Sequence, residues 1–372
     1  MGNVPNLRFP EFSGEWENCQ IANILSIGSG RDYKHLEKGN IPVFGTGGYM
    51  TSVNECIYDG ETTFIGRKGS INKPFYYNGK FWTVDTLFYT HSFNKTTPKF
   101  VYCLFQTINW LRYNEASGVP SLSKDTIEKI KVFIPQLDEQ RKISEMLSVI
   151  DARIATQTKI IEKLQSLIKG LSDNIHRDIK GETVCFSGLG EAYSGLSGKS
   201  GDDFGDGEPF ITYMNVYQNT YISEKDYEFV QIAPNERQNC VQYGDALFTL
   251  SSETPEEVGI GAVYLGNTQK LYLNSFCFGI HFYDERVLPQ YLAHFISSFS
   301  FRKAIYPLAQ GSTRFNLQKN DFMKMKFVLP TLEEQERIAK TLDALHYCMA
   351  NEKSLLEQYI LLKRYLLSQM FI

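Results

Sequence analysis

The most regular hydrophobic pattern in the chain is a heptad seam that occurs twice. The first copy is spaced by threes and fours over about five heptads, at Ile143, Leu147, Ile150, Ile154, Ile161, Leu164, Ile168, Leu171 and Ile175. Adding 195 to each number gives Ile338, Leu342, Leu345, Met349, Leu356, Tyr359, Lys363, Leu366 and Met370. Both copies skip one apolar position, which we place at Thr158 and Lys353. The pattern predicts two long helices that pack as a coiled coil.

The same ten-residue segment precedes both seams. The chain reads IPQLDEQRKI at 134–143 and LPTLEEQERI at 329–338, with five identical positions. A proline stands just ahead of each helix, where it cannot break the hydrogen-bond ladder, and acidic residues favour a helix N-terminus. Thr331 and Glu334 also form a capping box. We therefore predict long helices over 137–180 and 331–372, each some 40 residues and roughly 60 Å long.

The segments before the two helices indicate mainly β structure. Alternating or continuous apolar runs occur at 63–65, 81–89, 246–250 and 271–280, and helical patterns occur at 99–112 and 289–304. The segment from Leu122 to Val132 aligns with that from Leu317 to Phe327 at the offset of 195. We predict an α/β fold in which two mainly β-containing domains, 1–136 and 181–330, are joined by two long antiparallel coiled-coil helices. The whole chain would be a pseudo-two-fold internal repeat.

Composition excludes several classes of protein. The chain has 42% hydrophobic residues and a net charge of −4, which is typical of a globular protein and shows no overall basicity. The seven cysteines lie at least 37 residues apart, so neither a CxxC metal half-site nor a disulfide framework is expected. The opening residues lack a signal segment and no apolar run is long enough to span a membrane, so we expect a cytoplasmic protein.

Positive charge is unevenly distributed. Residues 1–136 hold 14 basic and 12 acidic residues, whereas 181–330 hold 11 basic and 17 acidic residues. Within these domains, 62–84 has four basic residues and no acid, and 301–326 has six basic residues and one acid. Lys and Arg beside Ser, Asn, Tyr and Gly suit contacts with DNA phosphates and base edges. The alternative is that both stretches are ordinary solvated loops.

No catalytic motif is complete. Residues 186–190 (FSGLG) fit the FxGxG loop of S-adenosylmethionine-dependent methyltransferases, but the chain has no Pro-Pro for the companion motif. Residues 195–200 (GLSGKS) resemble a phosphate loop whose first glycine is replaced by Tyr193. The six histidines do not fall at metal-ligand spacing, so we expect no metal site. The chain is predicted to be non-catalytic.

The doubled architecture resembles the specificity subunit of type I restriction–modification systems. The similar features are the opening PNLRFPEFSGEW, the GTGG and GRKGS loops, and the proline followed by LxEQxxI ahead of each long helix. The resemblance implies two target-recognition domains that each read one half of a split DNA site. It also implies spacer helices that dock two methyltransferase subunits, and restriction subunits that join the complex. S-adenosylmethionine would be used by the methyltransferase subunits, and this chain would bind no cofactor.

The resemblance and the local charge together suggest candidate site residues. The DNA-binding candidates are Arg31, Lys34, Arg67, Lys68, Ser70, Lys73, Lys199, Tyr213, Asn215, Ser251, Ser252, Ser312, Thr313, Arg314, Asn316 and Lys319. The partner-binding candidates are Leu137, Glu139, Gln140, Leu332, Glu334 and Gln335, although Glu139 and Glu334 could serve only as helix caps. Two alternatives remain: a coiled-coil adaptor that binds only proteins, and a fused DNA methyltransferase.

Overall fold

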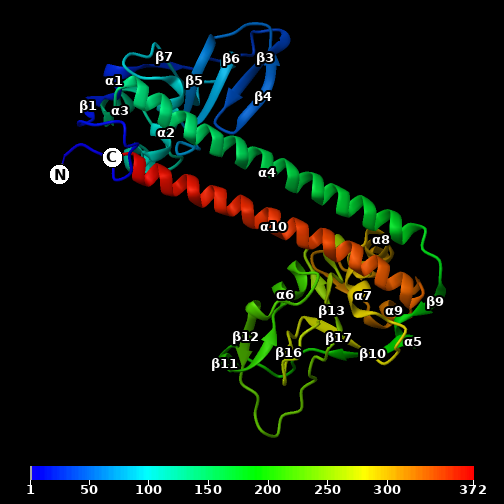
Figure 1. Cartoon of the computed structure of the whole chain (residues 1–372). Coiled ribbons are helices and arrows are strands. Elements are labelled where there is room, and N and C mark those ends of the chain that lie inside the picture. The colour runs from blue at the N-terminus through cyan, green and yellow to red at the C-terminus, as the bar shows by residue number, and fades with distance from the viewer. Residues whose placement is uncertain (1) are drawn as a thin grey trace. The chain divides into compact units, whose positions relative to one another are not determined.

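The computed structural model describes residues 2–372, which divide into two compact units (Figure 1). The first unit contains the residues up to Lys159 together with Lys353–Ile372, and the second contains Ile160–Glu352. Helices α4 (Leu137–Arg177) and α10 (Leu332–Met370) each contribute to both units. Within residues 2–372, no helix is long and apolar enough to cross a membrane.

The first unit is built on a six-stranded sheet in the order β2-β7-β5-β6-β3-β4. Its neighbours are antiparallel except β3 and β6, which run parallel. The strands are β2 (Ser26–Ser29), β3 (Lys38–Gly45), β4 (Gly48–Val53), β5 (Tyr58–Gly66), β6 (Phe75–Thr83) and β7 (Leu87–His91). A separate pair joins β1 (Glu17–Gln20) to β8 (Lys131–Ile134).

The segment before α4, here called the first head, contains short helices that share the apolar core of this sheet. They are α1 (Ile21–Ile24), α2 (Pro98–Thr107), η1 (Trp110–Tyr113) and α3 (Lys124–Lys129). Helix α2 begins at an N-cap, because the Thr97 side chain accepts a hydrogen bond from Phe100 N at 3.3 Å. Phe100, Val101 and Phe105 of α2 are fully buried in the core of this unit.

The second unit divides its strands among smaller sheets. A four-stranded sheet has the order β10-β17-β13-β15, and three-stranded sheets have the orders β12-β11-β16 and β14-β19-β18. The strands are β10 (Gly190–Ser194), β11 (Phe204–Ile211), β12 (Tyr227–Val230), β13 (Ala246–Thr249), β14 (Ser251–Ser252), β15 (Gly261–Val263), β16 (Tyr272–Leu273), β17 (Cys277–Phe282), β18 (Ala309–Gln310) and β19 (Phe315–Leu317). A pair of β9 (Glu182–Cys185) and β20 (Lys326–Leu329) completes the unit.

The segment between the two long helices, here called the second head, has a core cluster around Phe186, Phe248 and Phe322. The second head also contains short helices. They are α5 (Phe186–Leu189), η2 (Gly201–Asp203), α6 (Tyr213–Gln218), η3 (Glu224–Asp226), η4 (Pro255–Glu257), α7 (Pro289–Ser297), α8 (Phe299–Ile305), η5 (Tyr306–Leu308) and α9 (Lys319–Lys324). Helix α5 is the FSGLG stretch, and its Phe186 and Leu189 are buried. The stretch is therefore a core element of this head.

The two units repeat one frame. Helices α3 and α9, strands β8 and β20, and the first residues of α4 and α10 all lie 195 residues apart. The short helices α1 and α5 follow β1 and β9, which pair with β8 and β20 in the same antiparallel manner. Helix α4 begins at the expected residue 137 and ends at Arg177, three residues before the expected limit of 180. Helix α10 begins one residue after the expected 331 and ends at Met370, two residues before the expected 372.

Within each unit, the first half of one long helix contacts the last half of the other. In the first unit, Ile143, Leu147 and Ile150 are buried in the same core as Met370. The polar seam residue Lys363 is held there by Asp151, at 2.5 Å between Nζ and Oδ1. In the second unit, Ile338 and Leu342 are buried with Leu171 and Ile175 packed against their cluster.

Equivalent positions near the ends of α4 and α10 carry different rings. Phe371 stacks on Phe100 in the first unit, with ring centres 5.4 Å apart. His176, which lies 195 residues earlier, sits 5.8 Å from the ring centres of both Tyr291 and Phe295 in the second unit. Its Nδ1 donates to Ser172 O at 2.8 Å, while its buried Nε2 has no hydrogen-bond partner among the described residues. Burial lowers the pKa of His176, because the charged imidazolium loses its water.

The structure corrects one position of the predicted seam. Gln157 is buried, whereas Thr158 is exposed and donates its hydroxyl to Ile154 O at 2.9 Å. Gln157 completes the spacing of threes and fours, so the polar position of the seam is 157. The residue 195 further on is Glu352, and it is half-buried.

Several predicted elements are interrupted by turns. The run 81–89 divides into β6 and β7, because Leu87 N donates to Val84 O at 3.1 Å and closes a turn. The run 271–280 divides in the same way into β16 and β17. The helical pattern 289–304 becomes α7 and α8, since Ser298 leaves the helical path and its side chain caps α8.

Candidate nucleic-acid interface

The loop Arg67–Ser70 follows β5 and is fixed by its own backbone. Arg67 N donates to Thr86 O at 2.8 Å, and Arg67 O accepts from Leu122 N at 2.9 Å. Gly69 has a φ of +85°, a conformation that glycine adopts without the steric cost of a Cβ. The loop thus holds a defined shape between two other segments of the first head.

The side chains of this loop are basic and largely unengaged. Arg67 Nη1 donates to Asp85 O at 3.3 Å, and its guanidinium carbon lies 5.9 Å from the centre of the Phe88 ring. Lys68 and Ser70 are exposed, and within residues 2–372 their side chains form no hydrogen bond or ion pair. They are therefore available to an anionic partner.

The loop that carries Arg31 and Lys34 bonds to the turn between β6 and β7, and so does Arg67. Arg31 N donates to Thr83 O at 2.8 Å, and the turn that starts there reaches Thr86. Arg31 and Lys34 are exposed. The loop with these two candidates and the Arg67 loop therefore both bond to the backbone of the segment 83–86. Lys73 lies apart from them, in a groove beside α10.

The equivalent loop of the second head is Leu250–Glu253. Leu250 N donates to Phe276 O at 2.8 Å, and Leu250 O accepts from Leu317 N at 2.8 Å. Leu250 thus makes backbone bonds equivalent to those of Arg67. The residues that donate to their carbonyl oxygens, Leu122 and Leu317, are themselves 195 positions apart. Lys68 in the first head therefore corresponds to Ser251 in the second, and Ser70 corresponds to Glu253.

A pocket of about 310 Å³ opens beside this second loop. Its lining residues are Tyr213, Met214, Tyr217, Ser251, Ser252, Glu253, Glu257, Phe276 and Arg314. Tyr213 OH donates to Ser251 O at 2.8 Å, and its ring stacks on Tyr217 with centres 6.0 Å apart. Tyr217 OH donates to Glu257 at 2.7 Å, and this hydrogen bond raises the pKa of Tyr217. The pocket brings four predicted candidates, Tyr213, Ser251, Ser252 and Arg314, to one place.

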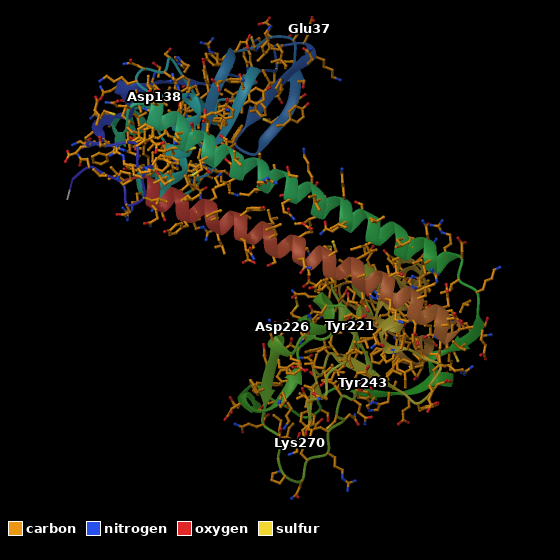
Figure 2. All side chains as sticks on the ribbon, viewed as in Figure 1. Glu37, Asp138, Tyr221, Asp226, Tyr243 and Lys270 are labelled. Carbon is orange, nitrogen blue, oxygen red and sulfur yellow. The ribbon has the colours of Figure 1, made fainter. Side chains whose placement is uncertain are left out.

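Two predicted DNA-binding residues have structural roles instead. Lys199 is largely buried and forms an ion pair with Glu236 at 2.6 Å. Asn215 is 2% exposed, and its amide nitrogen donates to the backbone oxygens of Ser223 and Asp226, the latter residue labelled in Figure 2. Neither side chain is free to meet DNA in this conformation, because its polar atoms are already used within the head.

The remaining candidates of the second head are divided in the same way. Ser312, Thr313 and Asn316 are exposed around the β18–β19 hairpin. Lys319 is half-buried with its Nζ 5.7 Å from the centre of the Phe278 ring, and burial lowers its pKa. Ser252 is buried, and its hydroxyl bonds within the loop to the backbone of Thr254.

The first long helix begins at a buried ion pair. Arg8 Nε and Nη2 each donate to Glu139 at 2.7 Å, and Trp16 Nε1 donates to the same carboxylate at 3.3 Å. Glu139 is 2% exposed. Arg8 and Trp16 of the opening segment therefore cover the acid of the first repeated segment.

The second long helix begins at an exposed ion pair. Glu334 bonds Arg337, three residues further along α10, at 2.6 Å, and this pairing lowers the pKa of the carboxyl. Leu332 and its counterpart Leu137 are 45% and 40% exposed. Among the predicted partner-binding residues, these two leucines and Glu334 are the ones that present surface.

The two glutamines of the repeated segments are buried and hydrogen-bonded in parallel ways. Gln140 Nε2 donates to Lys95 O and Pro135 O at 2.8 Å each, while its Oε1 accepts from Thr96 and Thr97.

Gln335 Nε2 donates to Arg286 O at 2.7 Å and Pro330 O at 2.8 Å, while its Oε1 accepts from Leu288 N at 2.8 Å. Both side chains have no exposed surface. The expected partner contact does not fit Gln140 and Gln335, because both fasten a head to its own helix.

A groove occurs at equivalent places in the two units. In the first it is lined from α10 by Ile360, Lys363, Arg364, Leu367 and Ser368. Subtracting 195 gives Gln165, Ile168, Lys169, Ser172 and Asp173, which line a groove of the second unit from α4. The last turns of α2 and α7 supply the opposite walls. His294, which lines the second groove, bonds Asp343 through Nε2 at 2.7 Å, and Tyr221 OH, labelled in Figure 2, donates to the same carboxylate at 2.7 Å.

Sequence reasoning missed Arg8, Glu253 and Phe276. The repeat gave no signal for Glu253, because the offset of 195 pairs Ser70 with Leu265, and only the backbone bonds of the two loops relate Ser70 to Glu253. Phe276 gave none, since it stands inside an apolar run that is predicted as one strand. Arg8 was noted only as part of the opening segment.

The chain matches known proteins along both of its halves. The model of the type I restriction modification DNA specificity domain matches residues 13–166 and again residues 182–359. A Haemophilus influenzae protein named as the type I restriction enzyme specificity subunit S.HindORF215P is 22% identical, over 88% of this chain and 86% of that one. The MjaVIII specificity subunit of Methanocaldococcus jannaschii is 23% identical, over 66% of this chain and 62% of that one.

Solved structures share the fold. The S subunit of a type I restriction–modification system from M. genitalium covers 99% of both chains with a TM-score of 0.65 and 13% identity. A chain from a structure on complex assembly and conformational transition of the type I system covers 95% of this chain and 97% of its own, with a TM-score of 0.57 and 14% identity. The expectation that this chain is a non-catalytic subunit is confirmed by its family. The chain belongs to the type I restriction modification DNA specificity family.

Proposed function

We propose that this chain reads a split DNA site, with each head reading one half. The target-recognition domains would span 1–136 and 181–330, and the spacer helices 137–180 and 331–372. The observation that carries the proposal is the pair of equivalent loops, Arg67–Ser70 and Leu250–Glu253, held by the same backbone bonds but with different side chains. A shared frame with different loops suits two half-sites of different sequence.

The long helices would act as an antiparallel coiled-coil spacer. Contacts between the first half of one helix and the last half of the other in each unit support this arrangement. Spacer length would then be set by the helices, and half-site sequence by the heads.

The same helices would dock two methyltransferase subunits, with restriction subunits joining them. The two equivalent grooves support this stoichiometry, because each carries an exposed basic residue at the same place, Lys169 in one and Arg364 in the other. A structure in which a similar chain was solved concerns assembly of the type I system. S-adenosylmethionine would belong to the methyltransferase subunits.

Half-site specificity can be tested with the chain assembled with its methyltransferase subunits. Arg67→Ala with Lys68→Ala should weaken binding through the first half-site only, and Arg314→Ala through the second only. Each lost phosphate contact lowers the slope of log K against log salt by about one, and each lost base contact costs roughly 1–3 kcal/mol at one position. A chain that binds only proteins would show no duplex affinity to lose.

The spacer role has its own test. Seven residues inserted after Thr158 and after Lys353 keep the heptad phase and lengthen each helix by about 10 Å. At 3.4 Å per base pair, the unread gap should grow by one to three base pairs while both half-sites stay the same. Mapping of methylated bases in cells measures this. An altered half-site with an unchanged gap would contradict the spacer role.

A further inference from the structure

Resting on the proposed function, we propose that the pocket beside Leu250–Glu253 reads one G·C base pair in the major groove. Arg314 would donate to guanine O6 and N7, and Glu253 would accept from the N4 amino group of the paired cytosine. Arginine on guanine and a carboxylate on cytosine match the hydrogen-bonding edges that this pair presents there.

The pairing of β14 with β19 brings the two side chains to one pocket. Strand β14 pairs antiparallel with β19, with Ser251 opposite Asn316 and Ser252 opposite Phe315. The pairing ends there, and the next residues of the two segments, Glu253 and Arg314, both line the pocket. Paired residues of this kind have Cβ atoms about 5 Å apart, so side chains that directly follow them can reach neighbouring groups of one base pair.

Both charges are unsatisfied within the head. Glu253 and Arg314 are exposed, and within residues 2–372 neither side chain forms a hydrogen bond or an ion pair. The neighbouring acids differ, since Glu256 is bonded by Tyr306 and Glu257 by Tyr217. Of the acids at 253, 256 and 257, Glu253 is the one whose carboxylate is free to accept a hydrogen bond from a ligand.

The pocket wall is preformed. Tyr213 is fixed by its bond to Ser251 O and by its stack on Tyr217. Phe276 and Met214 remain 55% and 47% exposed in the same lining. Fixed tyrosines beside exposed apolar surface suit base edges better than a loose phosphate contact, because phosphate needs only positive charge.

The first head lacks this pair. Ser70 stands where Glu253 does, and Val119, 195 residues before Arg314, stands in its place. Val119 is 66% exposed, and the charged side chains of the loop that ends at Ser70 are Arg67 and Lys68, which are both basic. The proposed reading of G·C therefore applies to the second half-site alone.

The test uses the chain assembled with its methyltransferase subunits and a set of duplexes with every single-base change in both half-sites. Glu253→Ala and Arg314→Ala should each reduce discrimination about tenfold or more at one position of the second half-site, the same position in both variants. Glu228→Ala, an exposed acid on β12, is the matched control and should change nothing.

Base analogues give a second readout. Replacing the read guanine by 7-deazaguanine, which lacks N7, should weaken binding of the native protein and have no further effect on Arg314→Ala. Replacing it by inosine, which lacks only the minor-groove amino group, should have no effect on either.

The outcomes separate the two proposals. If the native complex neither binds nor methylates a specific duplex, the proposed function fails. If it does so and Glu253→Ala keeps full discrimination at every position, the reading by Glu253 is wrong. Relaxation of two different positions by the two variants would overturn the single base pair.

Discussion

The two long helices begin with nearly the same residues but fasten their acids differently. Glu139 is enclosed by Arg8 and Trp16, whereas Glu334 faces solvent and pairs with Arg337 of its own helix. The glutamines that follow are buried alike and bond to equivalent parts of their heads. A repeated motif therefore contains one residue with a shared role, the glutamine, and one whose role depends on whether another segment covers it.

The largest expected difference between the two helix starts is the loss of stability when each acid is neutralised. Glu139→Gln should lower the free energy of unfolding by about 3 kcal/mol, because Arg8 would keep a largely buried charge without its partner. Glu334→Gln should have no measurable effect. Urea unfolding of the two variants measures the difference, and equal losses would show that the covering segment contributes nothing.

A second test sharpens the shared role of the glutamines. Gln140→Leu and Gln335→Leu should each lower the free energy of unfolding by about 2 kcal/mol, since buried backbone groups would lose their partners. The losses should be similar, in contrast to those of the acids. A large loss from one glutamine alone would mean that the two joints are not equivalent.

The smallest expected effect compares His176 with Phe371. Burial lowers the pKa of His176 in the folded chain, so the unfolded chain binds the proton more tightly. Stability from this residue is therefore present above its ordinary pKa near 6.5 and is lost as the pH falls below it.

His176→Phe should copy the packing of Phe371 and stabilise the second unit by about 1 kcal/mol, because it removes an unbonded buried nitrogen. The gain in melting temperature should be larger at pH 5.5 than at pH 7.5. Some dependence on pH should persist, because burial also lowers the pKa of His294. Identical gains at both pH values would exclude a titrating His176.

Much of the frame could be predicted from sequence because its signals are local and periodic. The offset of 195, the seam residues and the helix start at 137 follow from spacing, and the second start, expected at 331, is displaced by one residue. The misplaced polar position shows the limit of such counting. Gln157 fits the spacing as well as any polar residue can, but only its burial distinguishes it from its neighbour Thr158.

The site was less predictable because its residues meet through sheet register and turns. Lys199 and Asn215 have the right chemistry for DNA, yet Glu236 and the backbone of Ser223 use their polar atoms. Glu253 and Arg314 lie 61 positions apart in the sequence, and the pairing of β14 with β19, which ends one residue from each of them, brings them to one pocket. Composition cannot distinguish a lysine in an internal ion pair from one at the surface.

The bonds of Gln140 and Gln335 bear on how such a chain can evolve. All but one of their partners are main-chain atoms, the exception being the hydroxyl of Thr96. A joint made to main-chain atoms places little demand on the side chains of the head it holds. Recombination at these joints would therefore exchange one head for a foreign one while the bonds of the glutamines to the main chain are kept.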